Sequence, residues 1–147
     1  MTLLSLMTLK KAALLGLCVV AASCGSTDAA SDGTFPAAAY ATVASTGGKL
    51  RVEIRTAPQP PTRGTMRIEL RVFDAATGVA QEGLTVDAVP WMPAMGHGTS
   101  VKPQVSIAKE GTYVLDGVSM FMPGRWELRI DFSGKVVDRV VPTLDIP

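Results

Sequence analysis

Apolar and polar residues alternate with a period of two along most of the chain after residue 48. The clearest stretch is 66–72, MRIELRV, in which every second residue is apolar and the others are charged. This alternation is typical of strands that bury one face. On the same criterion we expect strands at seven segments: 50–54, 66–72, 84–89, 104–107, 112–118, 125–132 and 135–144.

The segments between these strands are short and rich in glycine, proline and other turn-forming residues. We expect the third strand to end at Pro90, because proline has no backbone N–H to donate to a neighbouring strand. No segment repeats with the period of a helix. The pattern therefore predicts an all-β protein, an immunoglobulin-like antiparallel β-sandwich of about seven strands. We expect one inward face to consist of Trp126, Leu128, Ile130 and Phe132.

The first residues follow a different pattern. Lys10 and Lys11 precede the apolar run 12–20, AALLGLCVV, which is too short to span a bilayer. A basic segment followed by such a run is typical of a secretory signal. We interpret residues 1–23 as a cleavable signal peptide, which places the mature protein outside the cytoplasm.

The end of this signal, residues 21–24 (AASC), resembles a bacterial lipobox, in which small residues precede a cysteine that is lipidated. We therefore predict that Cys24 is lipidated and anchors the protein to a membrane of the cell envelope, on its periplasmic or extracellular face. Cys18 fits less well because the bulky Leu17 precedes it. The alternative is ordinary cleavage near Ala22, which leaves Cys24 as a free thiol.

Residues 24–48 have the composition of a flexible linker, rich in alanine, serine, threonine and glycine. The segment 35–43, FPAAAYATV, is more apolar than the rest and allows two interpretations. It either docks on the domain as an edge strand or is an apolar stretch within the linker. We favour the linker. The predicted sandwich domain then spans residues 49–147.

Charge and residue content exclude several classes of function. The net charge is +1, and it becomes −1 without residues 1–23, with 12 basic and 13 acidic residues. We expect no binding to nucleic acid, because no basic patch with interleaved aromatics is present. The chain has a single histidine and contains neither a G-x-S-x-G motif nor a glycine-rich phosphate loop. We therefore expect that the protein is not an enzyme.

Two segments combine residues that suit a soft metal ion. They are 91–98, WMPAMGHG, and 120–124, MFMPG, and they hold four of the five methionines after residue 24 and the single histidine. Thioether sulfur with one imidazole favours copper(I) over zinc, calcium or magnesium. The candidate ligands are Met92, Met95, His97 and Met122, with Met120 as a substitute for Met92 or Met122, and Trp91 and Phe121 are expected to shield the site.

A metal-free interpretation of the same residues is also open. Methionine fills irregular gaps in cores, and a histidine between two glycines is common at a solvated loop tip. In that case the methionine-rich loops form an apolar contact surface for a protein partner in the envelope. The two interpretations differ in whether the sulfurs converge with the imidazole at one exposed point.

Three motifs together resemble the YtkA-like domain, which is close to the FixH family: 91–98 (WMPAMGHG), 111–113 (GTY) and 121–128 (FMPGRWEL). The resemblance covers roughly residues 48–132. It implies an extracytoplasmic immunoglobulin-like sandwich that binds copper or delivers it to an acceptor protein, with Met92, Met95, His97 and Met122 at the matching positions. The predicted lipoprotein signal departs from FixH proteins, which retain a membrane helix.

Overall fold

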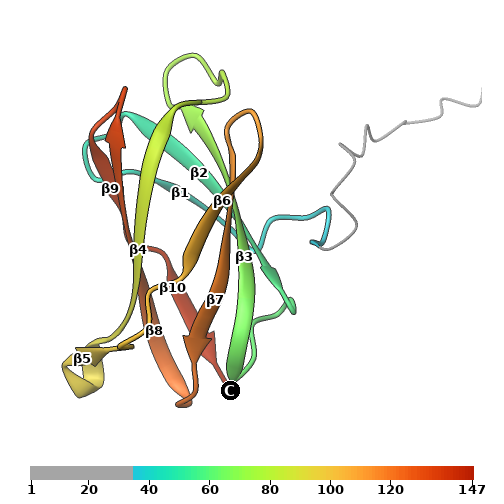
Figure 1. Cartoon of the computed structure of the whole chain (residues 1–147), viewed down its shortest axis with the longest axis vertical. Helices are drawn as coiled ribbons and strands as arrows, with labels where there is room; N and C mark the ends of the chain where they lie inside the picture. Colours follow the sequence, from blue (N-terminus) through green and yellow to red (C-terminus); the bar gives the residue numbers. More distant parts are fainter. Residues whose placement is uncertain (1–34) are drawn as a thin grey trace, which may run out of the picture.

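Ten strands and one short 3₁₀ helix make up the computed structural model, which describes residues 35–147 (Figure 1). The predicted signal peptide and Cys24 lie outside the described residues. Within residues 35–147 no helix is long and apolar enough to cross a membrane. The elements are β1 (Ala41–Ala44), β2 (Leu50–Ala57), β3 (Gly64–Asp74), β4 (Leu84–Met92), η1 (Pro93–Met95), β5 (His97–Gly98), β6 (Gln104–Lys109), β7 (Thr112–Met120), β8 (Gly124–Gly134), β9 (Asp138–Val140) and β10 (Thr143–Ile146).

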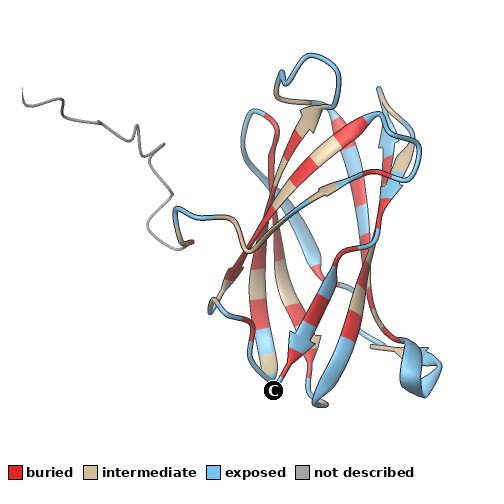
Figure 2. Ribbon diagram, turned by 180° about the vertical axis from the view of Figure 1, so that it is seen from behind, coloured by how far each residue is buried: buried red, intermediate tan, exposed pale blue. Residues whose placement is uncertain are grey.

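The strands form two antiparallel sheets. One has the order β1-β2-β3-β7-β6, and the other has the order β10-β8-β4-β5 with β9 paired to β8. Alternate residues of both sheets point inward and are buried between them, as the banding of the strands in Figure 2 shows. The predicted all-β immunoglobulin-like antiparallel sandwich is therefore confirmed.

The β8 strand illustrates how the alternation builds the core. Trp126, Leu128, Ile130 and Phe132 are each at most 2% exposed, while the residues between them face outward. Burying a large apolar side chain contributes about 1.5–3 kcal/mol. The inward face that the sequence predicts for this strand is confirmed.

The interpretation of residues 35–43 as linker is wrong. Phe35 is 4% exposed, and Ala41–Ala44 pairs with β2 as the edge strand β1. The segment is held because the Tyr40 backbone N–H donates to the Ile54 carbonyl and the Arg55 guanidinium donates to the Ala37 carbonyl. Within the described residues, the sandwich therefore includes residues 35–44 and is not limited to residues from 49 onward.

Two proline positions also differ from the prediction. The β4 strand continues through Pro90 to Met92, and Pro90 stays opposite Leu128 of β8. The Pro90 carbonyl accepts a hydrogen bond from Thr99 on the other side of β4, so the nitrogen that lacks a hydrogen also points away from β8. The expected strand 135–144 is divided at Pro142 into β9 and β10.

Candidate functional site

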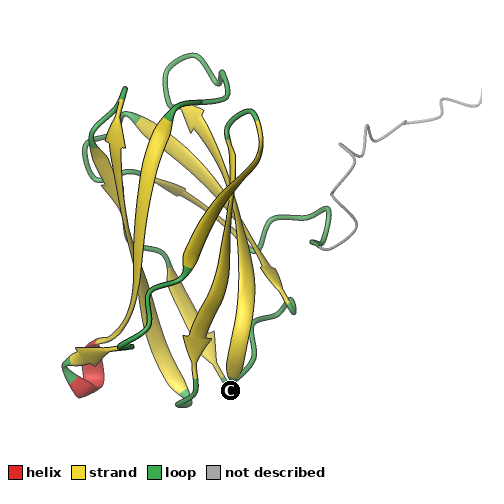
Figure 3. Cartoon of the chain, in the orientation of Figure 1, coloured by secondary structure: helices red, strands yellow, loops and turns green. Residues whose placement is uncertain are grey.

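The first methionine-rich segment forms a tight hairpin between β4 and β5 at one end of the sandwich (Figure 3). Pro93 starts the single turn of η1, and Gly96 ends it in a left-handed conformation, with φ 68°. The Gly96 N–H donates to the carbonyls of Met92 and Pro93. Only glycine adopts this conformation without strain, so these residues fix how the hairpin presents its side chains.

The hairpin places Met92 and His97 directly opposite each other in the β4–β5 pair. Residues opposite each other in an antiparallel pair point to the same side of the sheet, with Cβ atoms about 4.5–5.5 Å apart. Met92 is 7% exposed and belongs to the core, whereas His97 is exposed. The hairpin therefore sets a solvent-exposed imidazole opposite a buried methionine, and Met95 in the same hairpin is 56% exposed.

The second methionine-rich segment is the turn between β7 and β8. Met120 is the last residue of β7 and is fully buried, Phe121 is 66% exposed, and Met122 packs half-buried against the core. Met120 and Met122 therefore face the core, and Phe121 between them faces solvent. The Trp126 indole N–H donates to the Met122 carbonyl at 3.0 Å and ties the turn to β8.

A contact between Met92 and Gly124 joins the two segments at the same end of the sandwich (Figure 1). A Cβ atom added to Gly124 would lie 2.9 Å from the Met92 Cε atom. The Met92 methyl group therefore fills the space that a side chain at position 124 would occupy. Met122, two residues before Gly124, lies close to this contact along the chain.

Trp91 does not face the same way as Met92. Neighbouring residues of a strand point to opposite sides, so the Trp91 ring lies on the outer side of its sheet. There the Arg129 guanidinium stacks 4.4 Å from the ring centroid, and Gly98 leaves room for the ring edge. Phe121 is largely exposed. The structure thus brings Met92, Met95, His97 and Met122 to one end and sets Trp91 apart from them.

The donor set at this end consists of sulfur and one imidazole. Within residues 35–147 no three histidine, cysteine, aspartate or glutamate side chains are grouped as a metal site. Nor does this part of the chain enclose a pocket for a small organic ligand. Soft thioethers with imidazole suit copper(I), and the exposed Met95 and His97 are the donors that solvent reaches. Met120 is buried in the core and is not reached from this surface.

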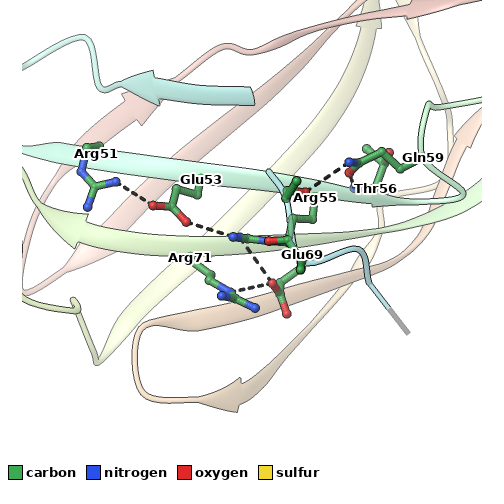
Figure 4. Close-up of polar contacts among 9 residues, drawn as sticks. Arg51, Glu53, Arg55, Thr56, Gln59, Glu69 and Arg71 are labelled. Carbon is green, nitrogen blue, oxygen red and sulfur yellow. Dashed lines mark hydrogen bonds and ion pairs between the residues drawn. The ribbon is translucent and has the colours of Figure 1, made fainter. Parts of the chain in front are cut away.

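A second cluster, which the sequence analysis did not single out, lies on the outer face of the sheet that contains β2 and β3 (Figure 4). It is a row of charged side chains: Arg51, Glu53, Arg55, Glu69 and Arg71. Arg55 and Glu69 are directly opposite each other and are 5% and 2% exposed. Alternating charges looked like an ordinary solvated strand face in the sequence, because the segment that covers them, residues 35–39, looked like linker.

The row pairs three arginines with two glutamates, so most but not all of its charge is compensated within the row. Burial raises the pKa of Glu53, but hydrogen bonds from Arg51 and Arg55 outweigh it and hold that pKa below its ordinary value. Arg71 donates to Glu69 at 2.8 Å. The Arg55 Nε–H donates to Ala37 in the covering segment. The arrangement stabilises the fold and fixes the covering segment, although the Arg55 Nη1 and Arg71 Nη2 atoms are buried without a hydrogen-bond partner.

Comparison with known proteins gives one match. A family model described as YtkA-like matches residues 45–131, which is more than half of the chain and includes both methionine-rich segments. No curated protein and no solved structure matches the chain.

Proposed function

The chain belongs to the YtkA-like family, and from that premise we propose that it is an extracytoplasmic accessory lipoprotein that binds copper(I) and passes it to an acceptor protein. The observation that carries the proposal is the contact of the Met92 methyl group with Gly124, because it brings both methionine-rich segments to the end where His97 is exposed.

The proposed ligands divide into an exposed and a buried pair. Met95 and His97 are exposed and are the first donors that an incoming ion meets. Met92 and Met122 are more buried and supply thioether sulfur from the core side. Such a graded set suits transfer by ligand exchange, since an acceptor protein can replace the exposed ligands while the buried ones still hold the ion. Met120 remains a core residue in this scheme.

A competition titration with copper(I) and a chromogenic chelator tests the proposal. The chain from residue 25 onward is suitable, because it lacks both cysteines, whose thiolates bind copper(I), and keeps every described residue. We expect a one-to-one complex that Met95→Leu and His97→Ala each weaken at least about tenfold, which is about 1.4 kcal/mol. Met66→Leu, a volume-conserving change at a buried methionine outside the site, is the matched control and leaves the affinity unchanged.

The pH dependence separates the roles of the two exposed donors. A protonated imidazole cannot bind a metal ion, whereas a thioether is not protonated in this range. Binding by the unchanged chain therefore weakens on acidification, and the residual binding of His97→Ala does not. No competition with the chelator, or binding that is indifferent to both substitutions, contradicts the copper proposal.

A metal-free protein-contact module is the second candidate, and the exposure of Met95 and Phe121 at the same end favours it. Flexible methionine side chains adapt to the surfaces of several partners. The partner would then be another envelope protein. In this case Phe121→Ala weakens partner binding while the titration above gives no complex.

A further inference from the structure

The β6 strand is the open edge of the sheet β1-β2-β3-β7-β6, next to β7 (Figure 1). All six of its residues are exposed. Natural edge strands are usually protected by charges, prolines or bulges, because their unpaired N–H and C=O groups recruit other strands. Residues 104–108 carry no charge, and the only irregularity is a register shift between Ile107 and Lys109 at the far end.

Two apolar side chains of β6 point toward the inner side of the sheet but are not covered by the opposite sheet. Val105 is opposite Leu115, and Ile107 is opposite Tyr113, which is a core residue like Leu115. Yet Val105 is 38% and Ile107 is 68% exposed. The inner face of β6 therefore extends beyond the core, and its apolar residues lie directly beside the open edge.

We propose that a second copy of this chain pairs with this edge, β6 against β6, antiparallel about a two-fold axis at Ser106. Such an axis is perpendicular to the sheet and passes between one residue and its own copy. In this register Val105 of each copy lies opposite Ile107 of the other. The four apolar side chains then cover one another on the inner side of a continuous sheet.

Charge complementarity selects Ser106 as the centre of the pairing. Lys102 and Glu110 lie just beyond the two ends of β6, each four residues from Ser106, so the Lys102 side chain of one copy comes to the same end of the pairing as Glu110 of the other. An axis at Val105 would place Ile107 opposite Pro103, and an axis at Ile107 would place Val105 opposite Lys109. Only the register centred on Ser106 matches both the apolar and the charged residues.

The Lys102 side chain is available for this contact. Its ammonium group already lies 2.8 Å from the Asp87 carboxylate, with 63% of the side chain exposed, so it can bind a second carboxylate without leaving the first. Because the two strands are antiparallel, the β4–β5 hairpins point to opposite ends of the dimer. The inference is therefore independent of copper binding at Met95 and His97, and either one can fail alone.

Disulfide cross-linking of the full chain tests the register. In a background with Cys18→Ser and Cys24→Ser, Ser106→Cys places two thiols opposite each other, with Cα atoms about 4.5–5.5 Å apart. This separation lies within the range of a disulfide. Diamide, which takes up the two thiol hydrogens, is expected to give a covalent dimer. Gln104→Cys is the matched control, because its two thiols lie about 14 Å apart in the same dimer and are not expected to form a disulfide.

A charge swap tests the pairing independently of the cysteines. Lys102→Glu and Glu110→Lys are each expected to reduce the cross-linking yield of Ser106→Cys severalfold and to lower the dimer fraction in analytical ultracentrifugation. The double variant, which restores opposite charges, is expected to recover both. An equal yield from Gln104→Cys, an absence of dimer with Ser106→Cys, or a double variant that does not recover would overturn the proposal.

Discussion

A single glycine determines how closely the two methionine-rich segments approach. Gly124 has φ 125°, and a Cβ atom there would lie 2.9 Å from the Met92 Cε atom. Gly64 has a similar φ of 119°, but nothing lies within 4 Å of an added Cβ atom. Substituting alanine at each of these two glycines therefore separates the effect of backbone strain, which both positions share, from the loss of the Met92 contact, which occurs only at Gly124.

We expect Gly124→Ala and Gly64→Ala each to lower the free energy of unfolding by about 1–3 kcal/mol through backbone strain. Gly124→Ala also displaces the Met92 side chain, so it alone weakens copper(I) binding. Urea unfolding and the chelator titration measure the two effects. Equal copper affinity in both variants would mean that Met92 is not a ligand.

Asp138 makes the stability of the fold depend on pH. Burial raises the pKa of its carboxyl group, but hydrogen bonds from the Ser45 hydroxyl and from the N–H groups of Gly47, Arg139 and Lys49 outweigh this and lower the pKa from 3.8 to about 2. Because the folded pKa lies below the unfolded one, the stabilisation is present above about pH 4. It is lost as the pH falls toward about 2.

We therefore expect the urea midpoint of the unchanged chain to fall between pH 4 and pH 2, and Asp138→Asn to reduce this fall and to lower the midpoint at pH 7. Asparagine keeps one acceptor oxygen but adds donors that face the N–H groups of the loop. A series of urea titrations from pH 2 to pH 7 checks both effects. If the unchanged protein and Asp138→Asn lose stability in parallel over this range, the hydrogen bonds to Asp138 are not the cause of the loss at low pH.

At the scale of elements, the pairing of β2 with β3 depends on the buried charges of its outer face. Arg55 and Glu69 are opposite each other, and the Arg55 side chain also holds the segment that leads into β1. Removing one partner of a buried ion pair leaves an uncompensated charge in a poorly solvated place. The covering segment and the charge row therefore depend on each other.

We expect Glu69→Ala to destabilise the fold by about 3–5 kcal/mol, and the double variant Arg55→Leu, Glu69→Leu to be less destabilised than the two single changes together. Asp145→Ala removes a pair with Arg125 whose side chains are about 70% exposed and is expected to cost at most about 1 kcal/mol. Denaturant unfolding of Glu69→Ala, Asp145→Ala, the two single leucine variants and the double variant gives the comparison. Additive losses at Arg55 and Glu69 would exclude a coupled pair.

At the scale of the whole molecule, we predict that a lipid on Cys24 holds the sandwich at a membrane surface. Ten residues separate Cys24 from Phe35, the first residue that the structure places, so the connection spans at most about 40 Å. We expect the chain to fractionate with membranes and to carry a covalent lipid, and Cys24→Ser to appear in the soluble extract. Fractionation and mass spectrometry check this, and membrane binding of Cys24→Ser would refute lipidation as the anchor.

The sequence alone determined the fold class, because a period of two is a property of each strand by itself. The alternation at 66–72 and 125–132 identified the buried faces directly. The motifs that carry the family were also visible as local patterns. The edge strand β1 and the continuation of β4 through Pro90 were not predictable in this way. Both depend on tertiary structure: β1 needs β2 as its hydrogen-bonding partner, and Pro90 is tolerated because its nitrogen points away from β8.

Only the tertiary structure decided which side chains meet. The sequence placed four methionines in two segments, but the contact of Met92 with Gly124 comes from two strands that are distant in sequence. The same holds for burial: Met120 is enclosed while Met95 is exposed, although both were candidate ligands. Residue type and spacing fix local chemistry, whereas exposure and contact depend on the packing of the whole sandwich.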